Sequence, residues 1–236
     1  MEVQIAAAKI NKYAVSESGD TLEVVERPHG GVSIVLADGQ TSGRGAKAIS
    51  MMVVRKVISL LAEGVRDGAA ARAASDYLFA EKNGKVSCTL NIVSVDLRTK
   101  TIVLASNNPS PVFVIREEDV DALNAGSSPI GVGDSIRPVI TEIPLEAGLT
   151  VVIYTDGLVH AGERRGQPMD IATTLHGLLD ENDPTPQEVS DVLLAQALRL
   201  DENRPVDDIS VVVVRVMPRQ GDDARRLTMR LPIQSG

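Results

Sequence analysis

Runs of β-branched residues alternate with helical patterns along this chain. Residues 31–37 form a short apolar run that stops at Asp38-Gly39, as a buried strand would. Beyond a glycine-rich segment, apolar residues recur at helical spacing from Ala46 to Leu61 and predict a helix that ends near Gly64. The next stretch, residues 67–81, is rich in alanine and predicts a second helix.

The rest of the chain predicts further strands and one more pair of helices. Thr185 precedes Pro186 and Glu188 and is a typical cap for the second of these helices. Three strand-like runs between residues 87 and 116 are separated by short polar turns and predict an antiparallel meander. The predicted strands are residues 22–26, 87–96, 100–105, 111–116, 136–143, 149–155 and 209–216, and the predicted helices are residues 169–179 and 186–200.

Strands come in groups and helices in pairs, which predicts an α+β layered fold with mostly antiparallel sheets. The chain shows no internal repeat and no low-complexity linker. We therefore expect a single domain over residues 1–217. Residues 218–236 form a polar tail, in which residues 227–233 have the pattern of an extra edge strand.

Composition narrows the classes of partner and compartment. Hydrophobic residues make up 43% of the 236 residues but aromatic residues only 2%, so the core must consist mainly of Val, Ile, Leu and Ala. A net charge of -8 argues against nucleic acid or an anionic membrane as the main partner, and a protein or small molecule is expected. A lone cysteine, Cys88, excludes an intrachain disulfide and a multi-thiolate zinc site. No secretory signal or spanning segment is visible, so we expect a soluble, cytoplasmic protein.

Acidic residues lie at the ends of the predicted strands. Asp38 and Asp156 each follow the end of an apolar strand, whereas Asp20 and the pair Asp207-Asp208 come before one. In antiparallel sheets the ends of some strands lie beside the starts of others. All these acids can therefore meet at one rim of the sheets.

Carboxylates that meet in this way repel each other unless a cation compensates their charge. A set of oxygen ligands without a His or Cys cluster suits Mg²⁺ or Mn²⁺. Two such ions about 3.5–4 Å apart activate a water and stabilise phosphoryl oxygens. Gly39 and Gly157, next to two of the acids, permit turns in which the backbone approaches an ion or a phosphate. The pattern thus predicts phosphoester hydrolysis by metal-activated water.

Four motifs carry a resemblance to a known family. They resemble, in order, the motifs of the PPM metal-dependent serine/threonine phosphatases, and specifically the SpoIIE-like bacterial branch. The resemblance runs from residue 18 to residue 216. The motifs are Ser18-Gly19-Asp20, Ala37-Asp38-Gly39 followed by Gly43-Arg44-Gly45-Ala46, Tyr154-Thr155-Asp156-Gly157-Leu158, and Asp207-Asp208-Ile209-Ser210 before a run of valines; residues 105–111 and Ser128-Pro129-Ile130-Gly131 add secondary matches.

This resemblance implies a fold and a ligand set. The fold would be two stacked antiparallel sheets flanked by helices, with two Mn²⁺ or Mg²⁺ ions in a cleft at one end. Asp38 would bridge both metals, and the Gly39 carbonyl would hold one of them directly or through a water. Asp156 and Asp207 would complete the set, and Asp20 matches an early acidic position that bears on one metal.

The chain also departs from the family pattern. Asp208 stands where the family often has Asn, so it ranks below Asp207 as a ligand. Eukaryotic members carry a His, thought to be the general acid, where this chain has Gln40, and their early phosphate-binding Arg has no obvious counterpart. Arg44 and Lys47, at the start of the long helix beside the metal rim, are the candidates to contact phosphate. His160, near Asp156, is an outside candidate for proton transfer.

The start of the chain lies almost at the phosphatase motifs, which we interpret as a lack of room for a sensor module. This compactness is similar to that of RsbX-type stressosome phosphatases. The resemblance therefore implies that the substrates are phosphorylated on Ser or Thr and are stressosome proteins or their STAS-domain partners.

Two other functions stay open. Residues 43–48 fit the dinucleotide-binding pattern G-x-G-x-x-A after a strand, but that site needs a second parallel strand ending in an acid about 20 residues later. Here Asp67 opens another predicted helix instead. A phosphatase-like regulator that binds partners with little turnover is the other alternative; the presence of every acid needed for two metals argues against it.

Overall fold

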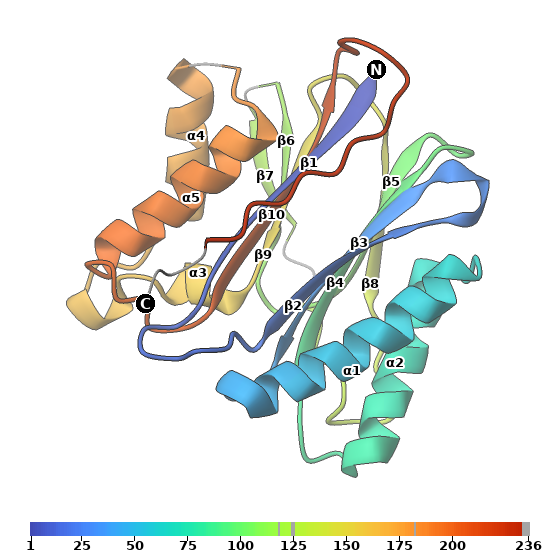
Figure 1. Ribbon diagram of the computed structural model, residues 1–236, viewed down its shortest axis with the longest axis vertical. Helices are drawn as coiled ribbons and strands as arrows, with labels where there is room; N and C mark the ends of the chain where they lie inside the picture. Colours follow the sequence, from blue (N-terminus) through green and yellow to red (C-terminus); the bar gives the residue numbers. More distant parts are fainter. Residues whose placement is uncertain (118, 124–125, 182, 233–236) are drawn as a thin grey trace.

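Two five-stranded sheets lie face to face and are covered on both outer sides by helices (Figure 1). The structure is a computed structural model that describes residues 1–117, 119–123, 126–181 and 183–232. Every strand pairing in it is antiparallel. The predicted α+β fold of two stacked antiparallel sheets is therefore confirmed. The dinucleotide-binding alternative needs a second parallel strand beside residues 43–48, and none of the described strand pairings is parallel.

The first sheet contains both the first and the last strand of the chain, which pair with each other along their whole length. In spatial order it consists of β1 (Glu2–Ile10), β10 (Ile209–Met217), β9 (Thr150–Tyr154), β6 (Val112–Arg116) and β7 (Asp119–Leu123). The second sheet consists of β2 (Asp20–Glu26), β3 (Val32–Gly39), β4 (Cys88–Asp96), β5 (Thr101–Asn107) and β8 (Val139–Pro144).

The helices form the two outer layers. α1 (Gly43–Ala62) and α2 (Asp67–Lys82) cover the second sheet, whereas α4 (Ile171–Glu181) and α5 (Pro186–Leu200) cover the first (Figure 1). A short helix, α3 (Asp156–His160), follows β9, and two 3₁₀ turns, Pro28–Gly30 and Glu163–Arg165, complete the set. None of the helices in the described ranges is long and apolar enough to cross a membrane.

Three apolar layers hold these elements together: one under α1 and α2, one between the sheets, and one under α4 and α5. Val, Ile, Leu and Ala dominate all three, as the composition predicts. Among the described residues, Phe113 and Tyr154 are the aromatic side chains in this core, and their rings stack 6.0 Å apart. The predicted cap of α5 is also present, since Thr185 and Glu188 exchange backbone and side-chain hydrogen bonds.

The predicted meander through residues 87–116 is wrong in its last strand. β4 and β5 pair as expected, but β6 leaves the second sheet and pairs with β7 and β9 in the first. Pro109 and Pro111 lie in the connection, and neither can donate a backbone N–H to a sheet ladder. Asn108 ties this turn to the first sheet, because its side-chain amide donates to the Tyr154 carbonyl at 3.3 Å.

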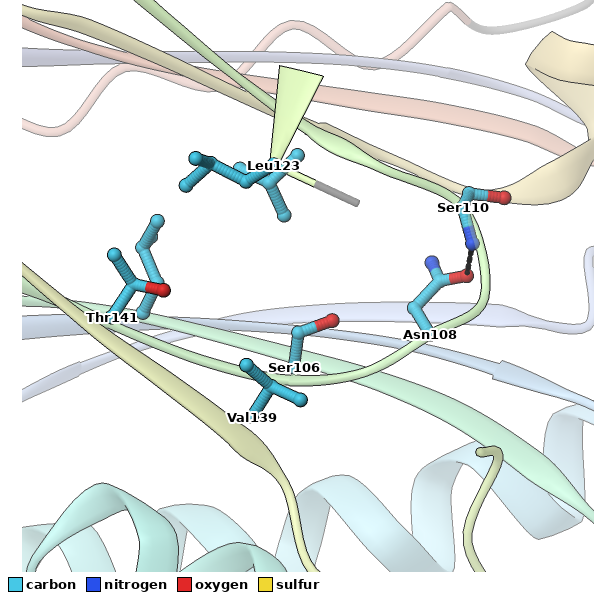
Figure 2. A pocket seen from close by; sticks show the side chains of 8 residues that line it. Ser106, Asn108, Ser110, Leu123, Val139 and Thr141 are labelled. Atoms are coloured by element: carbon cyan, nitrogen blue, oxygen red, sulfur yellow. Dashed lines mark hydrogen bonds between the residues drawn. The ribbon is translucent and has the colours of Figure 1, made fainter. Parts of the chain in front are cut away.

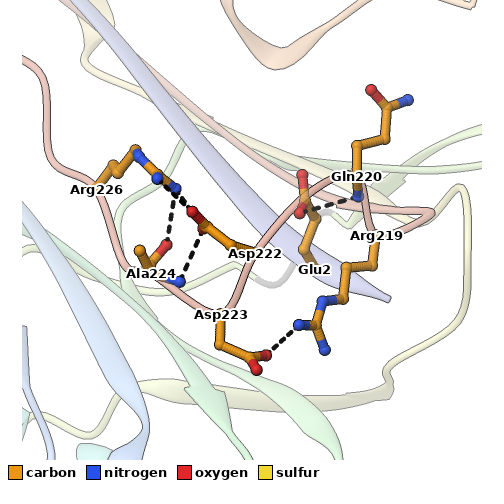
Figure 3. A network of polar contacts seen from close by, with 7 residues as sticks. All are labelled: Glu2, Arg219, Gln220, Asp222, Asp223, Ala224 and Arg226. Atoms are coloured by element: carbon orange, nitrogen blue, oxygen red, sulfur yellow. Dashed lines mark hydrogen bonds and ion pairs between the residues drawn. The ribbon is translucent and has the colours of Figure 1, made fainter.

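The tail after β10 carries no helix or strand over residues 218–232. The predicted edge strand is therefore absent over residues 227–232, and Ile233 lies outside the described residues. Hydrogen bonds and ion pairs between near neighbours bend the tail on itself, which a strand along a sheet edge would not allow. Figure 3 shows two of these contacts, Arg226 with Asp222 and Arg219 with Asp223, and a hydrogen bond from the Gln220 backbone N–H to Glu2 that ties the tail to β1.

The first turn of α1 packs unusually close to the ends of β2 and β3. A Cβ atom on Gly39 would lie 2.1 Å from the carbonyl oxygen of Ala46, and one on Gly19 would lie 2.6 Å from the Cβ of Ala46. Only glycine at both positions lets the helix reach the strands. This contact holds the backbone beside Asp20 and Asp38 in place.

Replacement of Gly39 by alanine tests this contact. The added methyl group forces α1 away from β3, and we expect a loss of about 1–3 kcal/mol in the free energy of unfolding, measured with urea. Gly45→Ala is the matched control. A Cβ there meets its nearest neighbour at 3.9 Å, so alanine in this helix is expected to stabilise by about 0.5–1 kcal/mol. Equal effects of both changes would refute the assigned role of Gly39.

Candidate metal centre

Asp20 and Asp38 face each other across two paired strands of the second sheet. β2 begins at Asp20 and β3 ends just after Asp38, and the antiparallel register places the two residues opposite each other. Their side chains therefore lie on the same face. Asp20 is completely buried, and Asp38 is partly exposed.

Asp156 and Asp207 come from the first sheet. Asp156 opens α3 directly after β9, and Asp207 lies just before β10. The two segments touch at Gly157, where a Cβ atom would lie 2.1 Å from the carbonyl oxygen of Asp208. Gly39 and Gly157 thus each permit a close approach, and in both cases the neighbour is protein backbone.

The Asp20 carboxylate joins the two sheets. Its Oδ2 atom accepts hydrogen bonds from the Ser210 hydroxyl at 2.6 Å and the Thr155 hydroxyl at 3.0 Å. Ser210 lies in β10 and Thr155 directly follows β9, so both donors come from the first sheet. Thr155 and Ser210 are themselves joined by a backbone hydrogen bond of 3.0 Å. The position of Asp20 thus depends on both halves of the sandwich.

The electrostatics show that the acids converge. Burial raises the pKa of Asp38 to about 9, and the nearby charges of Asp20, Asp156 and Asp207 act in the same direction. Burial and Asp207 also raise the pKa of Asp156. For Asp20, burial raises the pKa to about 6 against the opposing effect of its hydroxyl donors. A cluster of this kind needs a compensating positive charge to remain ionised.

The Asp208 carboxylate has a different role from the other acids. Its Oδ1 accepts from the backbone N–H of Lys12 and its Oδ2 from that of Gly19, both at 2.8 Å. Asp208 therefore fixes the two ends of the connection between β1 and β2. Sequence reasoning ranked it below Asp207 as a ligand, and its contacts assign it to holding this connection.

The donor set fits small divalent cations. The Oδ1 atom of Asp20 is buried and has no hydrogen-bond partner, which is the expected state of a ligand atom without its ion. Within the described ranges, no group of three or more His, Cys, Asp or Glu side chains is placed to hold a metal ion by itself. Mg²⁺ and Mn²⁺ do not need such a group, because these ions keep several waters and bind one or two carboxylates each.

Two lysines support Asp20 from behind. The ammonium groups of Lys9 and Lys47 each donate to the Asp20 carbonyl oxygen at 2.7 Å, and Lys47 also donates to the Thr21 hydroxyl at 2.9 Å. Burial, with the neighbouring charge of Lys47, lowers the pKa of Lys9. Sequence analysis missed Lys9, since it did not predict β1. The engaged ammonium of Lys47 makes it a support for Asp20 more than a ligand for phosphate.

The other predicted site residues lie around this centre. The Arg44 side chain is 92% exposed at the start of α1, and its nearest carboxylate is Glu17 at 4.0 Å. Gln40, which replaces the family's histidine, accepts a hydrogen bond from the Ser87 backbone N–H at 2.8 Å. His160 lies at the end of α3, where it binds Glu163 at 3.0 Å. Gly39 lies in β3 opposite Cys88. Cys88 is buried, as expected.

A small cavity between the sheets lies at the opposite edge from β1 and β2. Its walls come from β5 and β8 of one sheet and from β6, β7 and the turn before β6 of the other, and Figure 2 shows Asn108 accepting from the Ser110 N–H at 2.9 Å. With about 10 Å³ it has room for roughly one water. It therefore cannot hold a phosphorylated side chain.

Comparison with known families identifies relatives of this chain. The family model described as stage II sporulation protein E (SpoIIE) matches residues 28–217. The stage II sporulation protein E of Bacillus subtilis (strain 168) is 24% identical over 216 residues, which are 91% of this chain and 26% of that protein. The chain thus spans about a quarter of the length of this relative.

Solved structures show the same fold. The PP2C phosphatase domain of SpoIIE from Bacillus subtilis, solved with a fragment of its regulatory domain, has a TM-score of 0.81 at 23% identity and covers 93% of this chain and 64% of that one. RsbX in complex with magnesium has a TM-score of 0.67 at 16% identity, covering 90% and 94%. The catalytic domain of the serine/threonine phosphatase PstP with two manganese ions has a TM-score of 0.68 at 18% identity, covering 92% and 99%.

Added Mn²⁺ should stabilise the folded protein. In chelator at neutral pH, Asp38→Asn is expected to unfold at a higher temperature than the parent, because the raised pKa of Asp38 makes folding take up a proton there and Asn avoids that cost. Saturation with Mn²⁺ at about 100 times its Kd adds about 2.7 kcal/mol to the parent, and the variant should lose most of this gain. Thermal unfolding with and without Mn²⁺ measures both effects. The exposed Asp76→Asn on α2 is the control, and an equal Mn²⁺ response in Asp38→Asn would contradict the assignment.

Proposed function

We propose that this chain, which belongs to the SpoIIE family, is a metal-dependent serine/threonine protein phosphatase. The family match agrees with the resemblance expected from the motifs, and the structural neighbours are PP2C-type phosphatases. The observation that carries the proposal is the convergence of acids from both sheets around Asp20, whose buried Oδ1 atom has no partner.

Asp20, Asp38, Asp156 and Asp207 would hold two divalent cations, Mn²⁺ or Mg²⁺. When bound, the cations supply an activated water and neutralise charge on the phosphoryl oxygens. Solved relatives with magnesium and with two manganese ions support this choice of metal. In the overall reaction, water gives one oxygen to phosphorus, the ester bond breaks, and the substrate hydroxyl and inorganic phosphate leave.

The protein's own groups position this reaction. Lys9 and Lys47 fix the backbone of Asp20, and the hydroxyls of Thr155 and Ser210 orient its carboxylate. Arg44 is the candidate that grips the phosphoryl group, because its guanidinium is exposed beside the rim and has only a distant partner in Glu17. These contacts leave one oxygen of Asp20 for a cation.

For the substrate, we propose phosphorylated stressosome proteins or STAS-domain proteins, with the reaction taking place in the cytoplasm. The fold likeness to RsbX and the motif pattern support this class. Incubation with phosphorylated stressosome and STAS-domain proteins tests it directly. Manganese-dependent release of phosphate from them is the expected result, and release only from unrelated phosphoproteins would remove this substrate class.

Loss of Asp38, one of the acids that would hold the cations, should strongly lower turnover. We expect Asp38→Asn to lower manganese-dependent phosphate release by about a hundredfold or more, since loss of supporting contacts alone costs metal sites about 10–100-fold. Asp76→Asn, on the exposed side of α2, should keep the parent rate. If the parent releases no more phosphate than Asp38→Asn, the chain is a partner-binding regulator and the enzymatic proposal fails.

A further inference from the structure

One aromatic ring stands out at the rim of the metal centre. The chain has three Tyr and two Phe and no Trp, and two of these five rings, Tyr154 and Phe113, are buried. Tyr13 is 56% exposed, more than Tyr77 on α2 at 38%. It lies in the connection between β1 and β2, directly after Lys12, whose ammonium is 3.9 Å from the Asp207 carboxylate.

The Tyr13 ring is held in a fixed pose. The guanidinium of Arg204 lies over it, 5.4 Å from the ring centroid, and the Tyr13 N–H donates to the Pro205 carbonyl at 2.9 Å. The loop of Tyr13 is anchored to Asp208, and the turn of Arg204 is anchored to the buried Asp201. Figure 1 shows the connection from β1 to β2 passing beside the start of β10.

Both turns contain residues in the energetically unfavourable left-handed backbone conformation. Ala14, next to Tyr13, has a φ of 63°, and Glu202 and Asn203, before Arg204, have φ values of 52° and 59°. Residues other than glycine adopt left-handed conformations of this kind at a cost of about 1 kcal/mol or more. Such conformations persist where the surrounding structure imposes them. Two such turns meet here and present one aromatic ring and one guanidinium to solvent.

Cationic side chains lie on the two segments that meet here. Lys12 lies next to Tyr13, with its ammonium 3.9 Å from the Asp207 carboxylate, and the Arg204 guanidinium lies over the Tyr13 ring. Within the described residues, Arg204 forms no ion pair with a carboxylate, so its polar edge is open to a ligand. An exposed, rigid aromatic side chain with a stacked arginine is typical of the residues that dominate binding in protein interfaces.

We propose that Tyr13 and Arg204 dock the polypeptide of the substrate beside its phosphorylated residue and favour acidic flanking residues. The inference rests on the proposed phosphatase function, because a phosphoryl group at the acids brings its flanking residues over this rim. The Tyr13 ring packs against the peptide, and the Arg204 guanidinium pairs with a carboxylate on it. The connection between β1 and β2 is then a determinant of substrate choice.

The test compares a peptide with a substrate that has no peptide flank. The probes are a phosphoserine peptide with Glu on both sides of the phosphoserine, the same peptide with Gln at those positions, and p-nitrophenyl phosphate. In Tyr13→Ala, the ratio of kcat/KM for the Glu peptide to that for p-nitrophenyl phosphate should fall about tenfold. Tyr13→Phe should keep the ratio, and Arg204→Gln should remove the preference for the Glu peptide over the Gln peptide.

Tyr77→Ala is the matched control. Tyr77 is also an exposed tyrosine under a cation, with the Lys56 ammonium 5.7 Å from its ring centroid, but Lys56 lies about 20 Å along α1 from its first residue. This variant should keep the parent ratio. An unchanged ratio in Tyr13→Ala, or a change of equal size in Tyr77→Ala, overturns the docking proposal.

Binding separates this proposal from the catalytic one. Fluorescence anisotropy of the labelled Glu peptide should show about tenfold weaker binding to Tyr13→Ala than to the parent. If the parent binds the peptide in a Tyr13-dependent way but hydrolyses nothing, docking stands and the phosphatase function falls. If the parent hydrolyses the peptide but binds it no more tightly than Tyr13→Ala and Arg204→Gln do, the phosphatase function stands and docking falls.

Discussion

Repulsion between buried carboxylates is the constraint around which this molecule is built. Asp20, which is fully buried, and Asp38, which is partly exposed, face each other across two strands, and the acids of the other sheet add to their charge. Hydroxyl donors and two lysine ammoniums offset this repulsion only in part, because one carboxylate oxygen of Asp20 is left without a partner. The fold therefore holds a local deficit of positive charge at its rim, which metal ions are suited to fill.

Close backbone contacts make that concentration of charge possible. Gly19 and Gly39 let the start of α1 press against the second sheet, and Gly157 lets α3 press against the strand that follows Asp207. The glycines beside the acids thus act on protein packing first, and the placement of the carboxylates follows from it.

Sequence patterns predicted the layers, most of the elements and the acids, because buried strands that end in Asp-Gly are visible locally. They missed β1, since a run of alanines at its centre has little strand propensity and its partner, β10, lies at the far end of the chain. They ranked Asp208 below Asp207 as a ligand but could not show that the Asp208 carboxylate holds the connection between β1 and β2, since its partners Lys12 and Gly19 reach it only after folding. Lys9 was hidden for the same reason as its strand.

The pairing of β1 with β10 has a consequence for synthesis. The acids of the candidate centre are spread over nearly the whole sequence, and Asp207 leaves the ribosome long after Asp20. A nascent chain that has released only its first half contains Asp20 and Asp38 but lacks Asp156 and Asp207. Its strand β1 also lacks its partner β10. Completion of the candidate centre and of the first sheet therefore requires translation through β10.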